Sequence, residues 1–538
     1  MVAIMKKHSF WPLTRFALFL LSAMVPGAAT AAAKEPLRVG VDANYSLDME
    51  RAGAQWTWDG TPTDLFEGMA RRGVTEFRVR LWTREDGPHG KAYATAVVQQ
   101  ALQAGLNPYL VLFLSEDWSD MMKQPLPAAW QGLSLDERAE AVRVYSRDVV
   151  AHFRRQGLKS HLYEIGNEID YGLCGEYPGK GTKKNPETLS RGLWPRSARI
   201  IRASQAGVRE ADPEAKFMLH IAHWWDAEFC EAFFRFMLDQ GVQLDFAGLS
   251  YFPSSNIGGS LEMDQFGDTV SRLAAAIRRP VIVAETAYPS TRDFKGQFSR
   301  WKYEVLGYPL TPDGQRRWVA DFLAFCDSHP DISAVYYWSP EWYGEGMWKA
   351  FAFFDPLGAA KPAWSAVAGP AYAGRALKRP VYVEAVSNQL FVVPVEEAKA
   401  KMIPLIRELR ERTGGVTVEH IALLTNTILE AGPYRVDLKG SLSQNLNLVL
   451  EPGHPGIPLA GDRPDLEAKL AVLAATVDPA RDHLVLIDRG APTPGIERAV
   501  AFFEQRGIEV VVHPKPEALP LKFGMCGAFG AVADNNDP

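Results

Sequence analysis

The chain alternates between amphipathic stretches with helical spacing and short apolar runs over most of its length. Apolar residues that recur every three or four positions indicate helices, whereas short apolar runs indicate buried strands. Residues 63–72 have helical spacing, for example, and the strand-like run EFRVRL follows soon after Gly73. Glycine suits such a junction because it readily adopts the left-handed conformation that ends a helix. This regular alternation predicts an α/β fold.

Eight apolar runs in the first two thirds of the chain are candidate strands. They lie at residues 37–41, 76–81, 108–114, 161–165, 216–221, 246–250, 281–284 and 334–338. Eight strands with seven helical crossovers, and a last helix after Pro362, predict a (β/α)8 TIM barrel. A doubly wound open sheet is the alternative. It is disfavoured because DANYSLD, and no glycine-rich dinucleotide loop, follows the first strand.

The pattern changes near residues 371–380, so we predict a barrel domain over 34–372 and a smaller α/β domain of unknown role over 373–538. In the second region, residues 495–506 have helical spacing. Its predicted strands are VTVEHIALLTN (416–426), NLVLEPG (447–453), HLVLIDRG (483–490) and GIEVVVHP (507–514). A chain of 538 residues is long enough for two such domains.

The N-terminus has the composition of a secretory signal peptide. Lys6, Lys7 and Arg15 precede the apolar stretch FALFLLSAMV, and small residues follow Pro26. We predict a signal peptide over 1–33 and a secreted or periplasmic protein. A membrane anchor is the alternative, but the apolar run is shorter than the roughly 20 residues that a spanning helix needs.

Charge and cysteine content restrict the partners. The net charge of −6 provides no basic footprint, so we expect no nucleic-acid partner. No segment after the N-terminal one is long and apolar enough to predict a stable membrane span. We also expect a monomer. The four cysteines lack the CxxC spacing of zinc or redox sites. A disulfide from Cys174 and buried free thiols both stay open.

Glu168 and Glu285 are the candidate catalytic residues. Each follows a short apolar run, in HLYEIGNEI and RPVIVAETAYP. In a TIM barrel the active site lies at the carboxyl ends of the strands, and paired carboxylates there are typical of glycosidases. Asn167 precedes Glu168, where its amide suits a hydrogen bond to a sugar 2-hydroxyl.

Arg78, Arg80 and Trp82 alternate with apolar residues, which predicts that all three face the barrel interior or its rim. Two buried guanidinium groups need acidic partners, and the two glutamates could supply them. A structural ion pair low in the barrel is the alternative, above all for Arg78. Glu164 has the interior parity and is interpreted as an arginine partner.

Aromatic residues at the strand ends suggest stacking surfaces for sugars. The candidates are Trp82, Trp118, Trp224, Trp225, Trp338 and Trp342. The alternative is that each fills a core. His220 and His223 raise the question of a metal, but no third ligand follows at a recognisable distance. We therefore expect no metal and no cofactor, and interpret His220 as a hydrogen-bond donor in the active site.

Several motifs together resemble a known enzyme family. GNEI (166–169) and ETAYP (285–289) are similar to the acid/base and nucleophile motifs of clan A glycoside hydrolases. The resemblance narrows to glycoside hydrolase family 53, the endo-β-1,4-galactanases, through FRVRLW, PAAW, GLSYFP, ETAYP and YYWSPEW, between about residues 37 and 367.

This resemblance implies a retaining hydrolase of β-1,4-galactan. Glu168 would be the general acid/base and Glu285 the nucleophile of a double displacement. Arg80 and Tyr251 would keep Glu285 ionised, and Trp338 corresponds to the family's tryptophan at the end of strand eight. The resemblance also favours the expected role of His220.

The chain departs from the family pattern around the sugar. Residues 113–116 (FLSE) stand where the family has histidine followed by Tyr-Ser-Asp. Ser339 replaces an acidic residue, and Glu164 replaces a more usual amide. Galactan is therefore the leading substrate, with a different β-linked exopolysaccharide as the alternative. A non-catalytic carbohydrate-binding protein is the third hypothesis, which the intact glutamate pair disfavours.

Overall fold

The computed structural model describes residues 34–386 except 256, 258–261 and 306, and several later segments. These are 389–392, 434–438, 446–450, 457–458, 463–475, 477–488, 494–514 and 519–521. The predicted signal peptide and the strand predicted at 416–426 lie outside the described residues.

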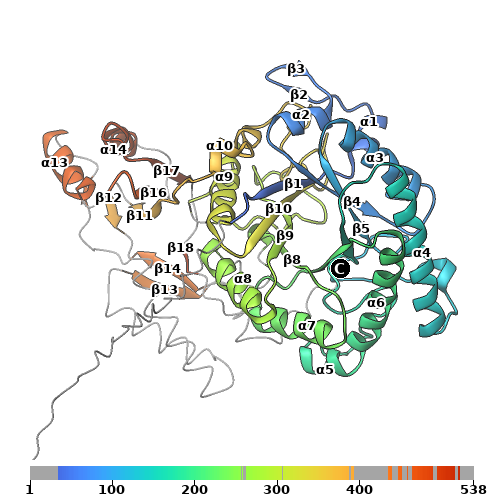
Figure 1. Cartoon of the computed structure of the whole chain (residues 1–538). Helices are drawn as coiled ribbons and strands as arrows, with labels where there is room; N and C mark the ends of the chain where they lie inside the picture. Colours follow the sequence, from blue (N-terminus) through green and yellow to red (C-terminus); the bar gives the residue numbers. More distant parts are fainter. Residues whose placement is uncertain are drawn as a thin grey trace, which may run out of the picture. The chain divides into compact units, whose positions relative to one another are not determined.

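Eight parallel strands close into a barrel (Figure 1). They are β1 (Arg38–Asp42), β4 (Glu76–Leu81), β5 (Asn107–Leu112), β6 (Leu162–Ile165), β7 (Lys216–Ile221), β8 (Phe246–Tyr251), β9 (Val281–Thr286) and β10 (Ile332–Trp338). Each strand pairs with the next in this order, and β10 pairs with β1. The predicted TIM barrel is therefore confirmed, with a strand at each of the eight predicted places.

Helices surround the barrel as Figure 1 shows. The longer ones are α2 (Leu65–Arg71), α3 (Lys91–Gln103), α4 (Leu135–Arg155), α6 (Leu193–Ala211), α7 (Ala227–Asp239), α8 (Met263–Ile277) and α9 (Pro312–Ser328). Shorter elements are α1 (Ser46–Arg51), α5 (Pro186–Arg191), β2 (Thr57–Trp58) and β3 (Thr61–Pro62). The last helix, predicted after Pro362, is a 3₁₀ turn (Pro362–Ala366) followed by α10 (Gly369–Tyr372).

Two hydrophobic clusters hold the barrel together. The larger one packs the outer faces of the strands against the helices. The smaller one fills the interior and includes Tyr109, Met218, Ile282 and Tyr336, all fully buried. The barrel interior is thus a packed core, and the polar groups at the strand ends lie against it. Among the described residues, no helix is both long and apolar enough to cross a membrane.

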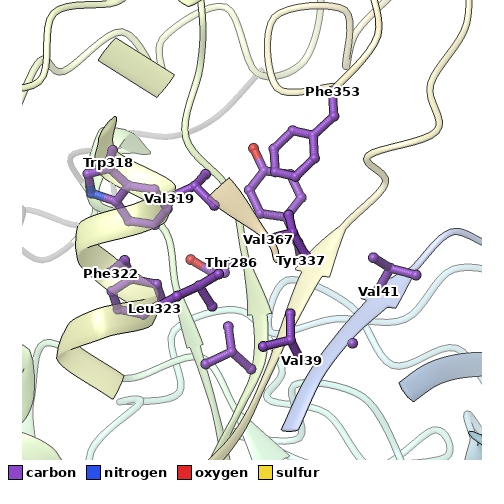
Figure 2. A pocket seen from close by; sticks show the side chains of 12 residues that line it. Val39, Val41, Thr286, Trp318, Val319, Phe322, Leu323, Tyr337, Phe353 and Val367 are labelled. Atoms are coloured by element: carbon purple, nitrogen blue, oxygen red, sulfur yellow. The ribbon is translucent and has the colours of Figure 1, made fainter. Parts of the chain in front are cut away.

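An irregularity in β9 decides where Glu285 points. Leu249 of β8 pairs with Val283, but the next residue, Ser250, pairs with Glu285. The extra residue, Ala284, forms a bulge, and both Ala284 and Glu285 face the interior. Thr286 faces outward into a small apolar cavity of about 20 Å³ between the sheet and α9 (Figure 2).

The C-terminal region contains a five-stranded sheet of order β15-β12-β11-β16-β17. Its strands are β11 (Arg379–Val386), β12 (Gln389–Val392), β15 (Ile457–Pro458), β16 (Asp482–Asp488) and β17 (Val510–Pro514). Helices α13 (Arg463–Ala474) and α14 (Pro494–Glu504) contribute Leu470 and Phe503 to its hydrophobic core. A second sheet combines β13 (Tyr434–Leu438), β14 (Leu446–Leu450) and β18 (Leu519–Leu521). Helices and strands are thus mixed, as predicted; the domain boundaries and the role of this region stay predictions.

Candidate active site

Arg78 is the central cation of the site. It is fully buried, and its guanidinium donates to Glu164 (2.6 and 2.9 Å) and to the Asn167 Oδ1 (2.7 Å). Its Nη1 also donates to Asp42 Oδ2 (2.7 Å) and to Glu285 Oε1 (2.6 Å). The planar fork of an arginine suits this many acceptors. Arg78 therefore does more than form a structural ion pair low in the barrel, because one of its three acidic partners is the candidate nucleophile, Glu285.

Glu285 is almost completely buried, with 4% of its surface exposed. Burial raises its pKa to about 7, the Arg78 cation pulls the pKa down, and the neighbouring Glu168 pushes it up. Arg78, and not Arg80, is the arginine in direct contact with Glu285, so the hydrogen bond expected from Arg80 is corrected, although the charges of Arg80 and Glu285 still interact. Arg80 lies two residues further along β4 and pairs with Asp42 instead, with Nη2 2.6 Å from Oδ1.

Tyr251 does not reach the site either. Its ring stacks on Phe266 of α8 (4.2 Å between centroids) and on Phe322 of α9 (5.1 Å), outside the barrel. Successive side chains of a strand point to opposite faces, so the preceding residue, Ser250, faces inward. Ser250 Oγ donates to Glu168 Oε1 (2.6 Å). The predicted contact of Tyr251 with Glu285 is therefore corrected, and Ser250 is a site residue that the sequence did not single out.

Glu168 is held by a strained turn after β6. Its φ is +45°, in the left-handed region that residues other than glycine seldom adopt. Gly166 makes this turn possible, because it has φ +79° and a Cβ there would lie 2.4 Å from the Ile169 side chain. The amide of Ile169 donates to the His220 carbonyl (2.9 Å) and anchors the loop to β7. Backbone strain of this kind is typical of functional sites.

The surroundings of Glu168 favour its protonated form. Burial raises its pKa to about 8, and the charges of Asp120 and Asp170 raise it further, while the Ser250 hydrogen bond lowers it. Among the described residues no cation forms an ion pair with Glu168, whereas Glu285 touches Arg78. The Arg78 cation thus favours the ionised form of Glu285, whereas the acidic neighbours of Glu168 favour its protonated form.

Asn167, Glu164 and His220 form a supporting layer behind the two glutamates. Asn167 Nδ2 donates to the Ser119 carbonyl (3.0 Å), which leaves one amide hydrogen for a ligand. Glu164 pairs with an arginine as predicted, and the charge of Arg78 holds its pKa down at about 2 despite burial.

His220 is fully buried and lies among the side chains of the site, where both ring nitrogens have protein partners; its contact with substrate stays a prediction. Its Nδ1 lies 3.1 Å from Glu164 Oε1 and its Nε2 lies 2.9 Å from Ser250 Oγ. His223 pairs with Asp170 instead (2.6 Å), so the two histidines have different partners. The described part of the chain contains no group of three side chains that could hold a metal ion.

Aromatic rings enclose Arg80 at the rim. Its guanidinium lies 4.9 Å from the ring centroid of Tyr45 and 5.1 Å from those of Trp118 and Trp338. Trp338 is only 3% exposed and Trp82 7%, so these predicted stacking surfaces are mostly covered. Trp118 is partly exposed and offers a face to a ligand, as do Trp225 and Trp342, whereas Trp224 is buried.

Two further carboxyl groups were missed from the sequence. Asp42 ends β1 and bridges Arg78 and Arg80. Like the two glutamates it follows an apolar run, and this signal could have identified it. Glu341 lies beyond β10 and is fully buried, and its Oε1 accepts from the Tyr45 amide (2.8 Å). Burial raises the pKa of Glu341 to about 8. No sequence signal marks it, because its burial depends on the packing of the loop.

The cysteines take no part in the contacts described above. Cys174, Cys230 and Cys326 are buried, and the thiols of Cys174 and Cys230 are not in disulfides. Cys526 lies outside the described residues. The possible disulfide of Cys174 is therefore not formed within the described part of the chain.

Comparison with known proteins gives a consistent assignment. The family model "Glycosyl hydrolase family 53" matches residues 38–379. An arabinogalactan endo-β-1,4-galactanase of Cellvibrio japonicus is 27% identical over 353 residues, which cover 60% of this chain and 87% of that protein. The corresponding enzyme of Thermothelomyces thermophilus is 25% identical over 312 residues (56% and 89%).

Solved structures share the fold. A structure of fungal β-1,4-galactanases superposes with a TM-score of 0.53 at 24% identity, covering 62% of this chain and 99% of that one. The catalytic domain of an Ignisphaera aggregans family 53 protein gives a TM-score of 0.53 at 23% identity (62% and 95%). The family match extends over more than half of the chain and contains both glutamates, so the chain belongs to glycosyl hydrolase family 53 and is a glycoside hydrolase.

Proposed function

We propose that the protein is an exported, retaining endo-β-1,4-galactanase. Glu285, ionised beside Arg78, attacks the anomeric carbon while Glu168 protonates the departing glycosidic oxygen. Glu168 then removes a proton from the water that releases the sugar. The observation that carries this proposal is the difference between the two carboxyl groups, since within the part of the chain that the structure describes Glu285 is the one with a cation in contact, at 2.6 Å.

The substrate follows from the relatives, which are named as arabinogalactan endo-β-1,4-galactanases. The partly exposed rings of Trp118, Trp225 and Trp342 suit the flat apolar faces of successive sugars. The apolar N-terminal stretch that follows Lys6 and Lys7 supports export.

A different β-linked polysaccharide is the second candidate. Phe113 is fully buried against Trp82 and Trp118, at the position where the family pattern has a histidine. The Ser339 hydroxyl is buried and has no hydrogen-bond partner among the described residues, at a position where the family has an acid. An altered set of polar contacts favours an altered sugar.

A polysaccharide panel separates these candidates. The mature protein is incubated with galactan, arabinogalactan and other β-linked polymers, and new reducing ends are measured. Release from galactan supports the first candidate, and release only from another polymer supports the second. Proton NMR of the first product tests the mechanism, because a retaining enzyme releases the β-anomer and an initial α-anomer contradicts the double displacement.

A further inference from the structure

Ser250 and His220 connect Glu168 to Glu164 through an unbroken line of hydrogen bonds. Glu168 Oε1 lies 2.6 Å from Ser250 Oγ, which lies 2.9 Å from His220 Nε2. His220 Nδ1 in turn lies 3.1 Å from Glu164 Oε1. Ser250, His220 and Glu164 are all 0% exposed, so these links exclude solvent.

The direction of these bonds follows from counting hydrogens. A serine hydroxyl has a single hydrogen, and Ser250 donates it to Glu168 Oε1. The lone pairs of Ser250 Oγ therefore face His220, whose Nε2 must donate a hydrogen to them. The Nδ1 of His220 has a partner in either form, because Glu164 Oε1 can accept from it and Arg78 Nη2, 3.4 Å away, can donate to it.

This direction distinguishes the two oxygens of Glu168. Oε1 accepts a hydrogen from Ser250, so a proton on the same oxygen would face that hydrogen. The proton of the neutral carboxyl group therefore belongs on Oε2. In a family where an amide is more usual at position 164, the carboxylate of Glu164 adds a fixed negative charge behind the ring.

We propose that Ser250, His220 and Glu164 are positioning residues that direct the transferable proton of Glu168 to its Oε2. This inference rests on the proposed role of Glu168 as acid/base. During cleavage the proton passes from Oε2 to the glycosidic oxygen. The Ser250 hydroxyl continues to donate its hydrogen bond to Oε1 and stabilises the carboxylate that forms. During hydrolysis Oε2 takes the proton from water, so the positioning residues end each cycle unchanged.

Other charged groups near Glu168 and His220 also influence the protonation of Glu168. Asp120 and Asp170 face Glu168 from the loops after β5 and β6, and Glu285 and Arg78 face His220 from β9 and β4. All of these remain in a Ser250 variant. A change of pH dependence in that variant therefore reports on the hydroxyl alone.

The first test compares Ser250→Ala with Ser250→Thr. Loss of the hydroxyl should lower kcat on the order of 10- to 100-fold with little change in KM, because a mispositioned acid slows chemistry more than binding. The alkaline limb of kcat/KM should move up by about one pH unit, because the carboxylate loses a donor. Substrates with poor leaving groups should suffer most, and threonine, which restores a hydroxyl, should recover part of the rate.

Ser146→Ala is the matched control. It removes another buried serine hydroxyl, paired at 2.8 Å with Ser204 between the outer helices α4 and α6. It should cost similar stability without moving the pH profile. If Ser250→Ala behaves like Ser146→Ala, the positioning role is rejected. If Glu168→Gln itself keeps full activity, the proposed function fails instead.

The second test needs no substrate. In ¹⁵N-histidine-labelled protein, with the His220 signals assigned from a His220→Gln variant, Nε2 should stay protonated while Glu168 is neutral. An unprotonated Nε2 at pH values where Glu168 is neutral would mean that Ser250 donates its hydrogen to His220, and this overturns the inference. Glu164→Gln should change the protonation of Nδ1 and leave the hydrogen on Nε2 in place.

Discussion

The two sides of the active site use the same residue type in opposite electrostatic surroundings. On the β9 side, Glu285 touches the Arg78 cation at 2.6 Å. On the β6 side, Glu168 has acidic neighbours, Asp120 and Asp170, and accepts a hydrogen bond from a neutral hydroxyl. Glu285 is 4% exposed and Glu168 is half-buried, and burial raises the pKa of both. The partners distinguish the two groups, because a cation favours the ionised form of Glu285 and acidic neighbours favour the protonated form of Glu168.

The side of the site that contains Arg78 and Glu285 also has more charge-assisted hydrogen bonds than the side that contains Glu168. Arg78 unites Asp42, Glu164 and Glu285 in one buried ion cluster, together with the Asn167 amide. Breaking one partner of such a cluster leaves uncompensated buried charge, which typically costs about 3–5 kcal/mol. The Glu168 side depends instead on a strained loop and on neutral donors, the Ser250 hydroxyl and the Met121 amide.

The largest expected effect is that of Glu285→Gln. Because Glu285 is the proposed nucleophile, its removal should lower kcat/KM on the order of 10⁵-fold, for good and poor leaving groups alike. Reducing-end release and circular dichroism test activity and folding together. Glu176→Gln is the control, because Glu176 is another buried carboxylate, bonded by Arg138 (2.8 Å) and Arg196 (2.9 Å). A Glu285→Gln enzyme with substantial activity would falsify the nucleophile assignment.

Glu168→Gln should have the next largest effect, a loss of about 10²- to 10⁴-fold on polysaccharide. The loss should shrink for aryl glycosides with good leaving groups, because these need less protonation. Added azide should restore turnover of Glu168→Ala on such substrates, since it replaces the water that the base activates. An equal loss on all substrates, without azide rescue, contradicts the acid/base role.

Arg78→Lys sharpens the comparison through pH. Lysine keeps the charge but loses the forked hydrogen bonds, so the pKa of Glu285 should rise and kcat should fall by about 10²-fold. Since the nucleophile acts ionised, the acidic limb of the pH profile should move to higher pH. Arg80→Lys, which alters the pair with Asp42, should move it less. Equal shifts in the two variants would mean that direct contact with Glu285 does not decide its pKa.

The smallest expected effect concerns Glu341. The pKa of Glu341 is about 8 in the folded chain and about 4.5 in the unfolded chain. Between pH 4.5 and 8, Glu341 is therefore protonated in the folded chain and ionised in the unfolded chain. Its contribution to stability therefore falls as pH rises from about 4.5 to 8. Glu341→Gln should raise the free energy of unfolding by about 1–3 kcal/mol at pH 8 and by little at pH 5. Thermal unfolding at both pH values checks this, and equal changes contradict it.

Much of the fold could be predicted because its signals are local. Each of the eight barrel strands is a short apolar run, and buried parallel strands require that pattern whatever their neighbours are. The positions of Glu168 and Glu285 after such runs placed both at the barrel rim. The inward direction of Arg78 and Arg80 also followed from strand alternation alone.

The assignment of partners within the site depended on register, which the sequence does not encode locally. The bulge at Ala284 turns Glu285 toward Arg78, and the inward face of β8 is occupied by Ser250, which leaves Tyr251 against α8 and α9. One residue of offset exchanges the two faces of a strand, which is why Tyr251 was assigned the wrong neighbours. Arg78 and Arg80 share a face, and the height of each along β4 decides that Arg78 meets Glu285 while Arg80 meets Asp42.

The barrel, the two carboxyl groups and the family could be predicted from residues that are neighbours in the chain, because apolar periodicity and short motifs are local properties. The contact of Arg78 with Glu285, the place of His220 behind Ser250 and the burial of Glu341 arise from packing between distant segments. The physical reason is that a pKa depends on charges and solvent within a few ångströms, and strands β4, β6, β7, β8 and β9 come that close only when the barrel closes.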